Sequence, residues 1–156
     1  MQLKKLILSA TILIGAASFC LMACSKDKYT TKPQLKFIKA QNYEVAYGEL
    51  LEMEIEFTDK EGDLSDSIFI QKVVPKCTNS NITQGYPMPK FTATSNLKGT
   101  MNITYVNGKF ISGYASLGAP LCGRNDTATF KFWIRDKAKN VSDTITSDKS
   151  IILKIP

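Results

Sequence analysis

Apolar and polar residues alternate along most of the chain after residue 33, and a period of two is typical of β-strands, not helices. The clearest stretch is 49–58, in which four apolar residues share one face and three glutamates share the other: Leu51, Met53, Ile55 and Phe57 against Glu52, Glu54 and Glu56. A helix would spread those glutamates around its circumference. The pattern predicts a half-buried strand with an acidic outer face.

The same alternation predicts further strands around Leu35, over 66–74 before Pro75, over 127–135 and over 149–155. In 127–135 the inward positions are Ala128, Phe130, Phe132 and Ile134. Trp133 then falls on the outer face, where we expect it to cover a second apolar patch.

The middle of the chain is less regular. Residues 77–98 are polar and punctuated by Gly85, Pro87 and Pro89, which predicts an irregular connection with at most a short strand over 91–94. Asn107-Gly108 favours a type I′ turn, so 100–116 is predicted to be a β-hairpin.

About seven strands, many turn signals and no convincing helical segment predict an all-β fold, an antiparallel β-sandwich. A small closed barrel of the lipocalin kind is the alternative.

The N-terminus has a different character. Lys4 and Lys5 precede an apolar stretch, and the small Ala23 stands just before Cys24, which is the pattern of a cleaved export signal over residues 1–23. An uncleaved transmembrane helix is the alternative, since 6–23 is 18 residues long, at the lower edge of the roughly 17–25 that span a bilayer.

The segment Leu21-Met22-Ala23-Cys24 resembles the lipobox of bacterial lipoproteins. The resemblance implies a diacylglyceryl group on Cys24, which anchors the mature chain in a membrane. Ser25 follows the cysteine where an aspartate would signal retention in the inner membrane, so the resemblance implies an outer-membrane lipoprotein. Residues 24–33 are then a lipidated tether, and residues 34–156 are the domain that it carries.

Two further passages, FTDKEGDLSD at 57–66 and FKFWIRDKAKNVSDT at 130–144, resemble the immunoglobulin-like (fibronectin type III-like) domains of Bacteroidota-type lipoproteins. The second is similar to their D-x-A-G-N-x-S corner, with Lys139 at the position of the glycine. The resemblance implies an immunoglobulin-like β-sandwich.

The amino-acid composition argues against several classes of function. Without residues 1–23 the chain has 133 residues and its net charge falls from +6 to +4, with scattered lysines, so we expect no nucleic-acid partner. The chain contains no histidine, which excludes Ser-His-Asp and Cys-His catalysis and histidine-ligated metal sites. We therefore expect no enzyme; a hydrolase that uses carboxylates such as Asp63 and Asp136 is the alternative.

Cys77 and Cys122 are the cysteines that remain after Cys24. Export places them in an oxidising compartment, where they are expected to form a disulfide worth roughly 4 kcal/mol. Two free, buried cysteines are the alternative.

Acidic residues gather after two of the predicted strands. If these loops share one end of the sandwich, seven oxygen-bearing side chains come together as a candidate calcium site: Asp59, Glu61, Asp63, Asp66, Asp136, Asn140 and Asp143. Tight turns select the same residue types, so ordinary turn chemistry is the alternative.

Tyr86 and Phe91 flank an aromatic, proline-rich segment. They are candidates for stacking on a glycan or contacting a protein, and the alternative is that they seal the edge of the core. Taken together, the sequence predicts a lipid-anchored, non-catalytic binding or accessory module whose partner is a glycan or an envelope protein. A calcium-stabilised structural spacer is the alternative.

Overall fold

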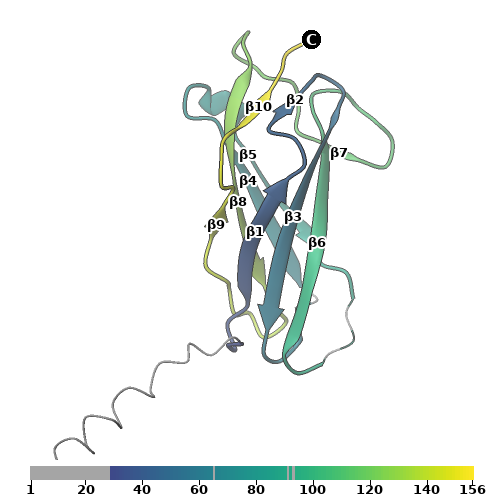
Figure 1. Cartoon of the computed structure of the whole chain (residues 1–156), viewed down its shortest axis with the longest axis vertical. Helices are drawn as coiled ribbons and strands as arrows, with labels where there is room; N and C mark the ends of the chain where they lie inside the picture. The colour runs from purple at the N-terminus through teal and green to yellow at the C-terminus, as the bar shows by residue number, and fades with distance from the viewer. Residues whose placement is uncertain (1–28, 65, 91, 93) are drawn as a thin grey trace, which may run out of the picture.

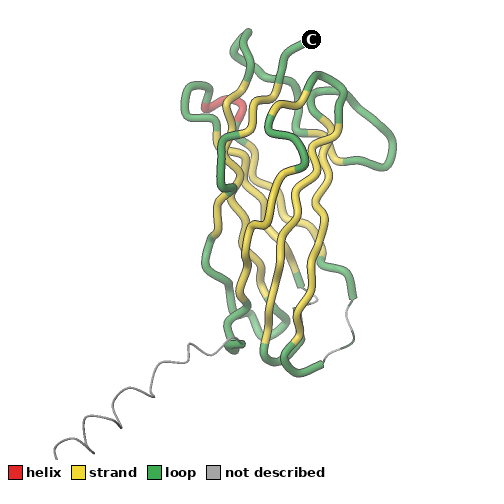
Figure 2. The backbone as a smooth tube through the Cα atoms, in the orientation of Figure 1, coloured by secondary structure: helices red, strands yellow, loops and turns green. Residues whose placement is uncertain are grey.

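The computed structural model describes residues 29–64, 66–90, 92 and 94–156 (Figure 1). The predicted signal peptide, the transmembrane alternative, Cys24 and Phe91 lie outside the described residues. Within them the chain forms two β-sheets with the core between them, and one short 3-10 turn is its only helical element (Figure 2).

The first sheet has four strands in the order β1-β3-β6-β7. Their bounds are β1 Gln34–Ala40, β3 Leu50–Asp59, β6 Leu97–Val106 and β7 Ala115–Ser116.

The second sheet has six strands in the order β2-β10-β8-β4-β5, with β9 paired to β8. Their bounds are β2 Glu44–Val45, β4 Ser67–Val73, β5 Ile82–Pro87, β8 Asp126–Arg135, β9 Ile145–Thr146 and β10 Ile151–Leu153, and the 3-10 turn η1 is Thr78–Ser80.

Alternation in β3 and β8 builds the centre of the core, as predicted. The inward residues of β3 are at most 2% exposed, and those of β8 are fully buried: Leu51, Met53, Ile55 and Phe57, and Ala128, Phe130, Phe132 and Ile134. These two strands belong to different sheets, so their apolar faces meet and hold the sheets together. The all-β prediction is confirmed for the described residues.

The prediction of a purely antiparallel sandwich is wrong in detail. Two short pairings are parallel, β10 with β2 and β6 with β7, so both sheets are mixed. The strands divide into two sheets instead of closing into one, so the closed-barrel alternative is also wrong.

The predicted irregular connection over 77–98 contains a regular strand, β5, which pairs antiparallel with β4. Gly85 belongs to this strand and not to a loop: it lies opposite Phe69, and a Cβ at Gly85 would come within 3.0 Å of the Phe69 ring. The glycine therefore makes room for an aromatic side chain on the neighbouring strand. Thr92 and Thr94, the described part of the predicted strand over 91–94, are not in a strand.

The predicted hairpin over 100–116 does not form, because β7 runs parallel to β6 after a long loop. Gly108 has a φ of 73°, but Asn107 is not among the positive-φ residues, so the pair does not make a type I′ turn. The Asn107 side chain is fully buried instead, and its amide donates to the carbonyls of Val45, Ala46 and Lys154.

Trp133 lies on the outer face of the second sheet, as expected. Its ring stacks on that of Phe69 with centroids 5.5 Å apart, and the Arg135 guanidinium lies 5.6 Å from the centre of the Phe69 ring. An outer apolar patch is thus covered by its own strand neighbours.

The strand directions give the sandwich two distinct ends (Figure 1). At one end β1 begins and β3 and β8 finish, and we call this the N-terminal end. At the other, the distal end, lie the C-terminus, the start of β3 and the loop from β6 to β7.

Candidate functional site

Three carboxylates from two loops come together at the N-terminal end. Asp59 is the last residue of β3, Asp63 lies in the turn towards β4, and Asp136 directly follows β8. One carboxylate oxygen from each residue lies within 4.8 Å of those of the other two. We call Asp59, Asp63 and Asp136 the carboxylate cluster.

The turn after β3 positions two of these side chains. The Oδ2 atom of Asp59 accepts the backbone N–H groups of Gly62 and Asp63, at 2.6 and 3.1 Å. Gly62 has a φ of 71°, and a Cβ there would lie 2.1 Å from the carbonyl oxygen of Thr94, so only glycine fits. Leu64 is fully buried and pins the turn to the core.

The turn after β8 positions the third carboxylate, that of Asp136. Asp136 Oδ1 accepts the N–H of Asn140 at 2.7 Å, and Oδ2 accepts its side-chain amide at 2.8 Å. Lys139 in this turn has a φ of 73°, a left-handed conformation that glycine adopts without strain. The two turns touch, since the N–H of Lys137 donates to the carbonyl of Asp63.

Two members of the carboxylate cluster are almost completely buried. Asp59 is 0% and Asp136 is 1% exposed. Burial raises the pKa of the Asp59 carboxyl, and the charges of Asp63 and Glu61 raise it further, against the backbone N–H groups that lower it. The Oδ1 atoms of Asp59 and Asp63 are buried and have no hydrogen-bond partner among the described residues.

The other predicted calcium ligands have different roles. Asp66 pairs with Arg135 at 2.8 Å and with Lys139 at 2.9 Å, and these two cations lower its pKa. Asp143 is exposed and pairs with Lys32 at 2.6 Å, and Glu61 is exposed. Asn140 orients Asp136 through its two hydrogen bonds. The seven predicted residues therefore separate into the carboxylate cluster of three and a surrounding group of four.

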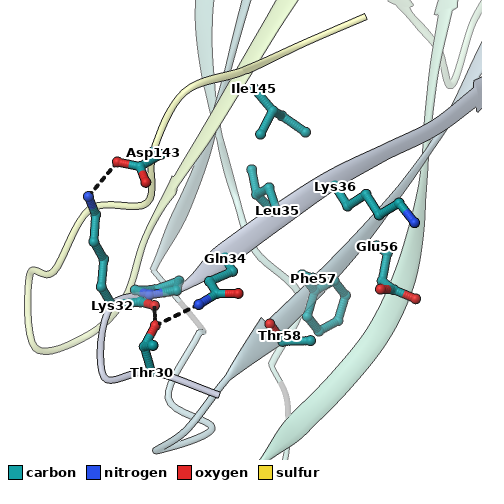
Figure 3. Close-up of a pocket in the computed structure, with 11 residues that line it drawn as sticks. Thr30, Lys32, Gln34, Leu35, Lys36, Glu56, Phe57, Thr58, Asp143 and Ile145 are labelled. Carbon is teal, nitrogen blue, oxygen red and sulfur yellow. Dashed lines mark hydrogen bonds and ion pairs between the residues drawn. The ribbon is translucent and has the colours of Figure 1, made fainter. Parts of the chain in front are cut away.

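A groove of about 850 Å³ lies between the start of β1, the end of β3 and the segment that leads into β9 (Figure 3). Leu35, Phe57 and Ile145 form its apolar part. The segment that enters β1 is held at its rim, because Thr30 accepts the N–H of Lys60 and Lys32 reaches Asp143. The last residues of the predicted tether thus rest against the domain.

Tyr86 lies in β5 and not in a loop. Its half-buried ring meets Tyr105 edge to face at 6.2 Å, and its hydroxyl donates to Gln84. This arrangement matches the sealing of the core edge that was the alternative for this residue.

Exposed apolar side chains collect at the distal end. Among the described residues, five of the seven large apolar side chains that are exposed lie there: Tyr47, Phe110, Tyr114, Leu121 and Ile155. Phe110, in the loop from β6 to β7, is 82% exposed and Leu121 is 65% exposed. The period-two pattern gave no signal for them, because they belong to loops.

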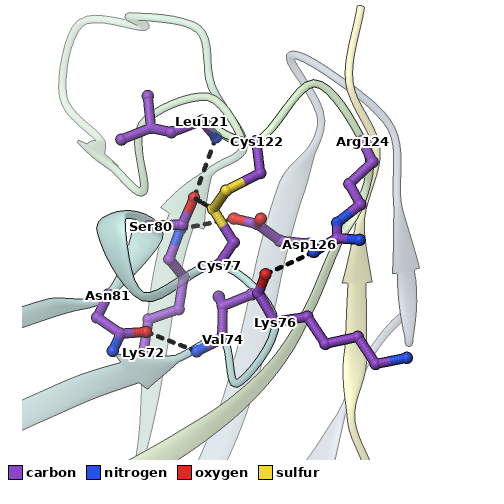
Figure 4. The surroundings of a disulfide bond; sticks show 10 residues. All are labelled: Lys72, Val74, Lys76, Cys77, Ser80, Asn81, Leu121, Cys122, Arg124 and Asp126. Carbon is purple, nitrogen blue, oxygen red and sulfur yellow. Dashed lines mark hydrogen bonds and ion pairs between the residues drawn. A yellow bond between two sulfur atoms is a disulfide. The ribbon is translucent and has the colours of Figure 1, made fainter.

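The disulfide Cys77–Cys122 is present at this same end, as predicted (Figure 4). Beside it Lys72 and Asp126 form an ion pair of 3.3 Å whose side chains are 2% and 0% exposed. Sequence reasoning missed this pair; the only available signal was a lysine at an inward position of β4.

No protein-family model matches the chain, and no curated protein is significantly similar to it. Within 29–156, leaving aside residues 65, 91 and 93, no helix is long and apolar enough to cross a membrane.

Proposed function

We propose that the protein is a lipid-anchored outer-membrane lipoprotein whose immunoglobulin-like sandwich is a non-catalytic binding or accessory module. The lipobox-like segment that ends in Cys24 supports the anchor. Two packed β-sheets with a disulfide support the immunoglobulin-like interpretation and an exported location. The partner is a glycan or an envelope protein.

One observation carries the binding role, the concentration of exposed apolar side chains on the distal loops. Phe110 is 82% exposed, and a group of exposed apolar side chains at one end of a molecule is typical of an interaction surface. Aromatic side chains on loops of a rigid scaffold stack on sugar rings or fill pockets of a partner. An anchor at the N-terminal end would turn these loops away from the membrane.

The two alternative functions, a carboxylate hydrolase and a calcium-stabilised spacer, are not equally well supported. Carboxylate hydrolases hold their two groups about 5–9.5 Å apart in an accessible cleft. The carboxylates named for this alternative are Asp63 and Asp136, and Asp136 is 1% exposed, which gives a substrate no access to it. The calcium-stabilised spacer is supported by the carboxylate cluster and is compatible with binding at the opposite end.

A glycan array tests the binding role. Residues 25–156 should bind a defined set of glycans, and Phe110→Ala should abolish the signal. Ile38→Ala is the matched control, since Ile38 is an exposed apolar residue on β1, away from the distal loops.

An envelope-protein partner is tested by a photoreactive phenylalanine analogue at position 110 of the full chain in cells, with the same analogue at position 38 as control. A binding role at the distal end is refuted if neither assay shows a contact that depends on residue 110. For the anchor, labelled palmitate should enter the wild-type chain and not Cys24→Ala.

A further inference from the structure

We propose that the carboxylate cluster of Asp59, Asp63 and Asp136 is a calcium site that ties the two sheets together at the N-terminal end. Calcium binds oxygen at 2.3–2.6 Å, so opposite ligands of one ion are roughly 4.6–5.2 Å apart. The three carboxylate oxygens lie within 4.8 Å of one another. They reach one ion without a change in the course of the strands.

Two unpaired oxygens point to a missing partner. Asp59 Oδ1 and Asp63 Oδ1 are buried and have no hydrogen bond among the described residues, and Asp59 is 0% exposed. A buried carboxylate oxygen without a donor or cation costs free energy. Arg135 and Lys139, on either side of Asp136, pair with Asp66 instead.

Turn chemistry explains only part of this arrangement. It accounts for Asp59 Oδ2, which accepts two backbone N–H groups, and for Asp136, whose oxygens accept from Asn140. It does not account for the burial of Asp59 Oδ1 and Asp63 Oδ1. A bound cation does, because it supplies both the charge and the coordination that these atoms lack.

The donor set selects the kind of ion. The cluster offers carboxylate oxygens and no sulfur or imidazole, which favours a hard cation over zinc or copper. Calcium takes six to eight ligands and tolerates irregular geometry, so water can complete a site with three carboxylates. Asp63 is only half buried and gives the ion a route from solvent.

The position of the site suggests its effect. Asp59 ends a strand of the first sheet, and Asp136 follows a strand of the second. Lys60, next to Asp59, holds Thr30 of the entering segment through its N–H. Calcium would therefore fasten both sheets at the point where the chain enters the domain. This role is independent of binding at the distal end, so a failed glycan experiment leaves it standing.

Thermal melting and isothermal titration calorimetry of residues 25–156, freed of metal with EDTA, test the proposal. We expect one calcium per chain and a Tm higher by roughly 8–13 °C at a free calcium concentration of 100 times Kd. Asp59→Asn should lose the calcium response. Without metal it should melt no lower than the wild type, because the amide retains an acceptor for the turn and removes a buried charge.

Asp143→Asn is the matched control. It removes an exposed acidic residue near the turn after β8 that pairs with Lys32, so its calcium shift should equal that of the wild type. Asp63→Asn, at the half-buried position, provides a second variant if Asp59→Asn does not fold. The proposal is overturned by a wild type that does not respond to 10 mM calcium, or by a full response in both cluster variants. An equal shift with magnesium would overturn the assignment to calcium.

Discussion

Removing one member of the buried Lys72–Asp126 ion pair should destabilise the fold more than neutralising both. The Lys72 Nζ atom lies 3.3 Å from Asp126 Oδ2 and donates to the carbonyl of Leu117 at 3.3 Å. Burial lowers the pKa of Lys72, and the charge of Asp126 opposes that shift. Asp126 Oδ1 has no partner among the described residues, so each charge depends on the other.

The burial of both side chains determines how much free energy of unfolding each variant should lose. Lys72→Met leaves a buried carboxylate without a counter-ion, and Asp126→Asn leaves a buried ammonium, so each single variant should lose about 3–5 kcal/mol. The double variant keeps only a poorly satisfied amide, which costs about 1–3 kcal/mol. The double variant should therefore be more stable than either single one, although a typical domain has only about 5–15 kcal/mol in total.

Urea unfolding at pH 7 with the disulfide intact, followed by Trp133 fluorescence, measures these differences. Lys154→Met is the matched control, because the Lys154–Glu44 pair has a similar length of 2.9 Å but side chains that are 45% and 62% exposed. It should lose less than about 1 kcal/mol. The reasoning is refuted if the costs of the two single variants simply add in the double variant, or if Lys154→Met costs as much as Lys72→Met.

Two other changes test the loops. Replacing both Cys77 and Cys122 by serine opens a link between residues 45 positions apart and should cost about 4 kcal/mol in urea unfolding; a loss below 1 kcal/mol would contradict the chain-entropy argument. Lys139→Gly should be more stable than Lys139→Ala by about 1 kcal/mol, because both lose the Asp66 contact but only glycine fits a φ of 73° without strain, and equal Tm values would contradict this.

The long strands were predictable because the alternation of apolar and polar residues within each strand shows which side chains are buried. β3 and β8 alternate over ten residues each, and their inward side chains meet across the core, so the local pattern and the global packing agree. The disulfide was predictable from the number of cysteines and the expected export, since after Cys24 only one pairing is possible.

The errors occurred where one residue type serves two purposes. Gly85 and Asn107 are of residue types that turns select, so the local pattern predicts turns at both positions. Gly85 instead makes space for Phe69, and Asn107 is a buried amide that joins three backbone segments. Both roles depend on residues distant in the chain, which a local pattern cannot identify.

The candidate calcium site, too, was only partly predictable from the sequence. Sequence reasoning brought the correct two loops together but could not rank their acidic residues. Asp66 has the same chemistry as Asp63, yet Arg135 and Lys139 pair with Asp66, and Asp63 Oδ1 finds no partner in the described part of the chain. Which carboxylates are neutralised depends on where side chains from other strands point.

The sequence by itself determined the class of fold, the inward faces of the long strands and the disulfide, because each depends on spacing along the chain or on the number of cysteines. Only the tertiary structure decided the parallel pairings, the buried Lys72–Asp126 pair, the gathering of exposed apolar residues at the distal end and the three members of the carboxylate cluster. These features arise between segments far apart in sequence, and their energies depend on burial and on the distances between charges.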